Sequence, residues 1–193
     1  MRSIYLTGVG GHGVLTLSGI LAEAALTSGF DVRKSEIHGM SQRGGSVVSQ
    51  VRYGNRVRSP VILAGTADVV ISLELLEGLR ALPQLKPDGV LLINEQRITP
   101  APVGRERAPY PEGVRGICEN AVDTVVIVPA LEMARGLGNE KAANVVMAGA
   151  FSAFAPEIPI EAWVRTIEAA FRPEHRDLNL NAFRAGQCFV EAE

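Results

Sequence analysis

The chain has 193 residues, of which 47% are hydrophobic and 21% charged, and its formal net charge is −2. This length is enough to bury a core without disulfides, and the balanced charge indicates no general preference for nucleic acid or membrane surfaces. No apolar stretch approaches the ~20 residues that span a bilayer, and the apolar run near Met1 is too short for a signal peptide. We therefore expect one cytoplasmic domain over residues 1–193, without nucleic-acid or membrane partners.

The first half of the chain begins with a strand, a glycine-rich turn and a helix. The pattern predicts a buried strand at 3–9, then a helix over 11–28 because apolar residues recur there at helical spacing. Further strands are predicted at 30–36 and 46–53, the latter rich in β-branched residues. The connection before residue 46 is too short for a helical crossover. Strand 46–53 is therefore expected to be an antiparallel partner or an edge hairpin.

The second half alternates strands with helices. Continuous apolar runs predict strands buried on both faces, and four prolines between residues 100 and 111 indicate an irregular excursion. The expected elements are strands at 68–73, 90–93 and 124–128, a turn at 87–89, and helices at 74–82, 130–136, 140–154, 160–171 and near the end. This alternation predicts an α/β fold, a single Rossmann-like domain whose mainly parallel sheet has an antiparallel insertion and helices on both faces.

A glycine-rich loop follows the first strand. Gly8, Gly10 and Gly13 fit the pattern G-x-G-x-x-G between a strand and a helix, with Gly11 and His12 between them. Such a loop lets the backbone approach a pyrophosphate at the positive end of the helix. These residues are candidate cofactor ligands; the alternative is that the glycines only form a tight turn.

Glu36 is the acidic residue that a dinucleotide site would place near the ribose, since it follows Gly13 by 23 positions. The segment after Glu36 does not continue into the usual helix, which argues against NAD. We keep Glu36 as a candidate cofactor-binding residue.

A second polar, glycine-rich segment lies between the strands at 30–36 and 46–53. Glycine allows backbone geometries closed to other residues, and such loops at strand ends are typical of subunit contacts or ligand sites. The alternative is a solvated hairpin in which Arg43 pairs with a local carboxylate. The candidate subunit-interface or active-site loop comprises His38, Gly39, Met40, Ser41, Gln42, Arg43, Gly44 and Gly45.

The chain has two cysteines, Cys118 and Cys188. An iron–sulfur cluster needs about four thiolates, and a structural zinc site is similarly disfavoured. We therefore predict no metal site on this chain. The spacing of the side chains identifies no nucleophile and base, so the catalytic residues stay unassigned.

Three motifs carry a resemblance to a known family. They are Gly-Val-Gly-Gly-His-Gly at 8–13, Glu-Ile-His-Gly-Met-Ser-Gln-Arg-Gly-Gly-Ser-Val at 36–47, and Val-Arg-Tyr-Gly at 51–54. In order and spacing they resemble the gamma-type subunits of 2-oxoacid:ferredoxin oxidoreductases, most closely the small (beta) subunits of the indolepyruvate enzymes. The similarity extends over nearly the whole chain. His12 departs from the family pattern, which has Gln there.

The resemblance implies a reaction divided between subunits. A 2-oxoacid such as an arylpyruvate would be oxidatively decarboxylated, coenzyme A would take the acyl group, and ferredoxin would accept the electrons. Thiamine diphosphate, Mg and 4Fe-4S clusters would lie on a large partner subunit, and no cofactor would be tightly bound on this chain. Coenzyme A is a possible ligand of Gly10–Gly13, with Arg43 near the subunit seam. The alternatives are a stand-alone NAD(P)- or flavin-binding oxidoreductase and a non-catalytic scaffold subunit.

Overall fold

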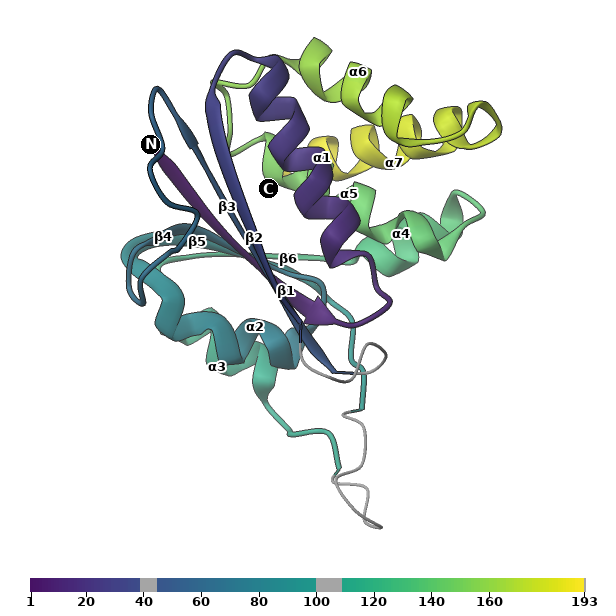
Figure 1. Cartoon of the computed structure of the whole chain (residues 1–193). Coiled ribbons are helices and arrows are strands. Elements are labelled where there is room, and N and C mark those ends of the chain that lie inside the picture. Colours follow the sequence, from purple (N-terminus) through teal and green to yellow (C-terminus); the bar gives the residue numbers. More distant parts are fainter. Residues whose placement is uncertain (39–44, 100–108, 193) are drawn as a thin grey trace.

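A six-stranded mixed sheet runs through the molecule (Figure 1). The structure is a computed structural model and describes residues 1–38, 45–99 and 109–192. The strands, in chain order, are β1 (Arg2–Val9), β2 (Asp31–His38), β3 (Ser46–Gly54), β4 (Ala67–Ser72), β5 (Leu85–Asn94) and β6 (Thr124–Val128).

The strand order is β2-β3-β1-β4-β5-β6. Strands β1, β4, β5 and β6 are parallel neighbours, whereas β3 is antiparallel to both β1 and β2. The prediction of a mainly parallel sheet with an antiparallel insertion is therefore confirmed. Strand β3 is an antiparallel partner inside the sheet, and the edge position belongs to β2.

Helices cover both faces of the sheet, as predicted (Figure 1). Helix α1 and helices α4 to α7 lie on one face, and α2 and α3 lie on the other. The α-helices are α1 (Val14–Thr27), α2 (Leu75–Ala81), α3 (Val114–Ala121), α4 (Ala130–Gly136), α5 (Ala143–Ser152), α6 (Ile160–Ala170) and α7 (Pro173–Glu191), with 3-10 turns η1 (Leu82–Gln84) and η2 (Glu140–Ala142).

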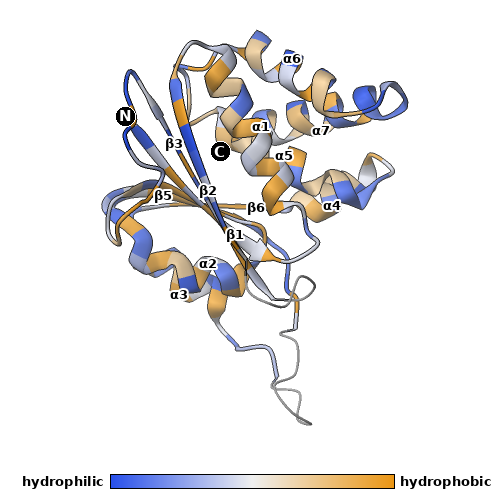
Figure 2. Ribbon diagram, viewed as in Figure 1, coloured by the Kyte–Doolittle hydropathy of each residue, from blue (hydrophilic) through white to orange (hydrophobic). Residues whose placement is uncertain are grey.

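Each face of the sheet buries its own hydrophobic cluster. The larger one lies under α1, α5 and α6 and contains Trp163, Phe151 and Phe183. The smaller one lies under α2 and α3 and includes Leu75 and Cys118. Strands β5 and β6 are predominantly hydrophobic, whereas the turn between α6 and α7 is hydrophilic (Figure 2). This distribution is the one expected for a sheet covered on both sides.

Three local predictions differ from the structure. The turn expected at 87–89 lies inside β5, where the pairing register shifts between Ala67 and Val69 and so accommodates Pro87 and Gly89. Helix α3 was not predicted; it begins after Gly113, which has a φ of 71°. The helix expected at 140–154 is divided into η2 and α5. Of the excursion expected at 100–111, residues 100–108 lie outside the described part and residues 109–111 are irregular.

Within the described ranges, no helix combines the length and the apolar character needed to cross a membrane.

Candidate functional site

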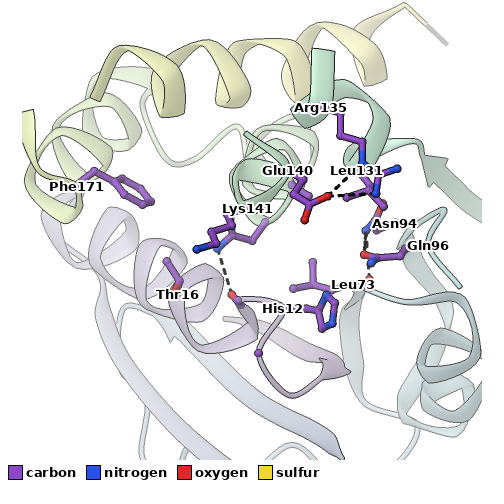
Figure 3. A pocket seen from close by; sticks show the side chains of 14 residues that line it. His12, Thr16, Leu73, Asn94, Gln96, Leu131, Arg135, Glu140, Lys141 and Phe171 are labelled. Atoms are coloured by element: carbon purple, nitrogen blue, oxygen red, sulfur yellow. Dashed lines mark hydrogen bonds and ion pairs between the residues drawn. The ribbon is translucent and has the colours of Figure 1, made fainter. Parts of the chain in front are cut away.

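A cavity of about 510 Å³ opens beside the glycine-rich loop at the carboxyl edge of the sheet (Figure 3). Strands β1, β4 and β5 all end at this edge because they are parallel. Helix α1 follows β1 on one face, whereas α2 follows β4 on the other face. The chain thus reverses its winding between β1 and β4, and such a switch point is where open α/β sheets bind ligands.

The glycine-rich loop forms one wall of the cavity, through Gly11, His12 and Gly13. Gly11 and Gly13 have φ values of 96° and 88°, which L side chains rarely adopt. Gly13 is also the N-cap of α1, and no side chain caps this helix end. Among the described residues, the amides of Gly11 and Gly13 donate no hydrogen bond. Two glycines of the cavity lining thus have backbone donors without a partner among the described residues, and they lie at the positive end of α1, an arrangement suited to an anion.

Gly8 and Gly10 have structural roles in the loop. A Cβ at Gly8 would lie 2.8 Å from Val14 Cγ2 and 3.1 Å from Leu73 Cβ, so glycine permits the close approach of α1 to the sheet. The Gly10 amide donates to the Gly45 carbonyl at 2.8 Å, which ties the loop to the start of β3. The first glycine of the motif, and not the third, thus allows the helix to pack closely on the sheet.

Basic side chains lie opposite the loop. Arg135 on α4 pairs with Glu140 at 3.2 Å. The Lys141 side chain points into the cavity above the loop (Figure 3), and it forms no ion pair with any described residue. The Asn144 amide is 6% exposed and donates to the Gly13 carbonyl at 3.4 Å. Lys141 is therefore the lining cation available to a negatively charged ligand.

Two amide side chains form the far wall. Asn94, the last residue of β5, donates to the Leu73 carbonyl at 3.2 Å and to Gln96 Oε1 at 3.1 Å, and it accepts from the Leu131 amide at 3.3 Å. These bonds fix the orientation of both amides. The aromatic ring of Phe171 lies at the opposite end of the cavity (Figure 3). The cavity thus has a polar end, a glycine-rich turn with Lys141 above it, and an aromatic end.

The structure places the predicted site residues in different environments. Gly11, His12 and Gly13 line the cavity. Glu36 does not line it, because β3 separates β2 from β1 and the Glu36 carboxylate pairs with Lys34 at 2.7 Å. Gly45 is described and lies against Gly10. The His38 side chain and residues Gly39, Met40, Ser41, Gln42, Arg43 and Gly44 lie outside the described part.

Sequence reasoning missed several lining residues, among them Thr16, Gln96, Lys141 and Phe171. One signal was present: Asn94 ends an apolar strand, and polar residues at that position of an α/β sheet face the ligand edge. Lys141 and Phe171 are far from the loop in sequence, and nothing in their local pattern marks them.

The lining can bind a ligand but offers little for covalent chemistry. It combines amides, one imidazole, one hydroxyl and two cations with the carboxylate of Glu140, which pairs with Arg135. In the part of the chain that the structure describes, no group of three or more His, Cys, Asp or Glu side chains is arranged to hold a metal ion. Cys118 lies away from the cavity, in the hydrophobic cluster under α2 and α3. Burial there raises the pKa of its thiol, which disfavours the reactive thiolate.

Comparison with known proteins agrees with this architecture. The family model described as pyruvate ferredoxin/flavodoxin oxidoreductase matches residues 3–188. The indolepyruvate oxidoreductase subunit IorB of Archaeoglobus fulgidus is 40% identical over 187 residues, which cover 95% of this chain and 92% of that protein.

Two solved structures are also similar. The pyruvate oxidoreductase subunit PORC of Thermotoga maritima has a TM-score of 0.74 and 26% identity, covering 96% of this chain and 94% of that one. The gamma subunit of a keto/oxoacid ferredoxin oxidoreductase from Geobacter sulfurreducens has a TM-score of 0.77 over all of both chains; at 24% identity this likeness shows the fold. The chain belongs to the pyruvate ferredoxin/flavodoxin oxidoreductase family.

Proposed function

We propose that this chain is the non-cluster subunit of a thiamine-diphosphate-dependent 2-oxoacid:ferredoxin oxidoreductase of the cytoplasm that acts on arylpyruvates such as indolepyruvate. The observation that carries the proposal is the match to the IorB subunit of Archaeoglobus fulgidus, which covers 95% of this chain and 92% of that protein. The whole chain, as one domain, then serves as a subunit beside a larger partner.

The proposed reaction is an oxidative decarboxylation. One arylpyruvate and one coenzyme A give an aryl-acetyl-CoA, CO₂ and one proton, and two electrons pass to two ferredoxins. The carbon–carbon bond to the carboxylate breaks and a thioester bond forms. Thiamine diphosphate with Mg supplies the electron sink for the first change, and 4Fe-4S clusters carry the electrons. We assign these groups to the partner, since this chain has two cysteines, one buried and one exposed.

Coenzyme A is the ligand that we assign to the cavity. Its pyrophosphate suits the unpaired amides of Gly11 and Gly13 together with the Lys141 ammonium. A volume of about 510 Å³ is within the range of cofactor pockets. The remaining part of the coenzyme, including the thiol, would extend beyond the cavity toward the partner subunit.

The test is anaerobic purification of the tagged chain from its native cells, followed by viologen reduction with indolepyruvate, phenylpyruvate and pyruvate. The proposal predicts a large cysteine-rich partner and activity that requires coenzyme A and is greatest with the arylpyruvates. Greatest activity with pyruvate would overturn the substrate assignment. Full turnover by the stabilised large subunit alone would show that this chain is a non-catalytic scaffold subunit.

A further inference from the structure

Two buried carboxylates lie behind the cavity, at the start of α2 on the opposite face of the sheet. Glu74 is the N-cap of α2 and Glu77 lies in its first turn. Their exposed fractions are 1% and 4%. Burying a carboxylate is costly unless hydrogen bonds or charges compensate it, and a helix end alone is capped as well by Asp or Ser. The contacts of these two side chains therefore indicate what they position.

Glu77 holds the wall of the cavity that carries the glycine-rich loop. Its Oε2 accepts from Ser46 Oγ at 2.5 Å and from Thr7 Oγ1 at 3.5 Å, and its Oε1 pairs with Arg80 at 2.6 Å. Ser46 directly follows Gly45, whose carbonyl accepts the Gly10 amide at 2.8 Å. A continuous set of contacts thus joins Glu77 to the loop.

Glu74 holds the opposite wall. Its Oε1 accepts from the Tyr110 hydroxyl at 2.7 Å and from the Ile98 amide at 3.1 Å. Two residues before Ile98, the Gln96 carbonyl accepts the Leu75 amide at 2.9 Å, and the Gln96 side chain lines the cavity. Residues 96–98, which contribute to the polar end of the cavity, are therefore hydrogen-bonded to the start of α2.

The two carboxylates are joined to each other. Glu74 Oε2 accepts the Glu77 amide at 2.9 Å, as an N-cap side chain does. We propose that Glu74 and Glu77 are positioning residues that set the separation of the two cavity walls, Glu77 through Ser46 and Glu74 through Tyr110 and Ile98. The assignment of coenzyme A as the ligand between these walls rests on the proposed function. The role of the two carboxylates in positioning the walls does not.

The test is amide hydrogen exchange, measured residue by residue by NMR on the full chain in two variants. Ser46→Ala removes the donor to Glu77 and should speed exchange of the Gly10 amide about fivefold, the effect of losing roughly 1 kcal/mol. The Leu75 amide should not change. Tyr110→Phe should speed exchange at Leu75 and Ile98 and leave Gly10 unchanged. Ser46 is exposed and Tyr110 partly exposed, so neither variant empties the core.

Matched controls separate this role from a general loss of hydroxyl groups. Ser28→Ala removes a serine hydroxyl that donates to the Ala24 carbonyl at 2.8 Å, at the far end of α1. Tyr53→Phe removes a tyrosine hydroxyl that donates to Glu157 Oε1 at 2.6 Å, at the end of β3 that lies away from Ser46. Neither control should alter exchange at Gly10 or Leu75. Unchanged exchange in Ser46→Ala and Tyr110→Phe would overturn the proposal, and so would faster exchange of both amides in each variant.

A second measurement tests whether the position of the two cavity walls affects the affinity for the ligand. Calorimetric titration of the chain with desulfo-coenzyme A should give a dissociation constant about fivefold higher in Ser46→Ala and in Tyr110→Phe than in the controls. Equal affinities in all four variants would contradict the positioning role. If the unmodified chain bound no desulfo-coenzyme A, the cofactor assignment would fail, and the exchange pattern would still decide the role of the two carboxylates.

Discussion

Gly149 on α5 and Gly186 on α7 each lie directly against the backbone of the other's helix. A Cβ at Gly149 would lie 1.9 Å from the Phe183 carbonyl oxygen, and one at Gly186 would lie 1.9 Å from the Val146 carbonyl oxygen. The two glycines are therefore required for α7 to dock on α5. This contact closes the larger hydrophobic cluster over Trp163 and Phe183.

Gly149→Ala should lower the free energy of unfolding by at least about 2 kcal/mol, because the helices must separate to admit the methyl group. The matched control is Gly19→Ala, since Gly19 also lies within a helix and its Cβ would meet no atom within 4 Å. That change should stabilise the chain by about 0.5–1 kcal/mol through helix propensity. Urea unfolding of both variants measures the difference; equal effects would show that the contact of α5 with α7 is looser than described.

Gly13 and Gly29 both have a φ of 88°, but only Gly13 has a close neighbour: its Cβ would lie 2.5 Å from Asn144 Nδ2, whereas a Cβ at Gly29 meets nothing within 4 Å. Each alanine variant should lose about 1–2 kcal/mol to the left-handed backbone. Gly13→Ala should lose more because it displaces Asn144. Adding Asn144→Ala should reduce the excess in a double-mutant cycle, because the closest atom, Nδ2, is removed and only the Asn144 Cβ stays within 3.1 Å. An identical loss for Gly13→Ala and Gly29→Ala would rule out the contact.

Tyr53 makes the free energy of unfolding fall as the pH rises in the alkaline range. Its hydroxyl donates to Glu157 Oε1 at 2.6 Å, and burial, followed by this carboxylate, raises its pKa well above the ordinary value of 10.0. The native state then keeps a proton that the unfolded chain releases. The corresponding stability is complete below about pH 10 and is lost as the pH rises toward the folded pKa, with a slope of about 1.4 kcal/mol per pH unit.

Urea unfolding between pH 9 and 11 measures this slope, and Tyr53→Phe should make it shallower. Absorbance at 295 nm should show that Tyr53 stays protonated in the native chain at pH 10.5. A tyrosinate signal from Tyr53 at that pH, or equal slopes in the two proteins, would contradict the assignment.

NAD and flavin nucleotides should not bind this chain. With β3 between them, β1 and β2 are about 10 Å apart, twice the separation of adjacent strands. Glu36 is moreover paired with Lys34. Thermal unfolding with millimolar NAD, NADP or FAD should leave the midpoint unchanged, whereas desulfo-coenzyme A should raise it. A saturable rise with a dinucleotide would favour the stand-alone oxidoreductase.

Much of the fold could be predicted because buried strands and amphipathic helices have strong local patterns. Residues 124–128 are a continuous run of β-branched side chains and form β6 with the predicted bounds. Helix α3 lacked such a pattern: it has eight residues, of which Val114 and Cys118 are buried. Strand β5 continues through Pro87 and Gly89 because a register shift tolerates them, and such pairing is not visible in one strand alone.

The candidate site could be predicted only in its glycine-rich loop. The loop is local, so its glycines and their positive φ values follow from the motif. The opposite wall depends on tertiary packing: Lys141 and Phe171 line the same cavity as the loop because α4, η2 and the end of α6 lie on the same face of the sheet as α1 (Figure 1). The insertion of β3, which removes Glu36 from the cavity, likewise depends on strand order.

We propose that the cavity beside the glycine-rich loop holds the phosphates of coenzyme A, with Lys141 as its cation. The most direct measurement is the KM for coenzyme A in indolepyruvate-dependent viologen reduction by the anaerobically purified complex. Lys141→Glu should raise this KM about tenfold and leave the KM for indolepyruvate unchanged, because only the phosphates meet the reversed charge. Arg165→Glu, an equal charge change at an exposed position on α6 away from the cavity, should leave both values unchanged. An unaltered KM for coenzyme A in Lys141→Glu would show that the phosphates of coenzyme A do not lie at Lys141.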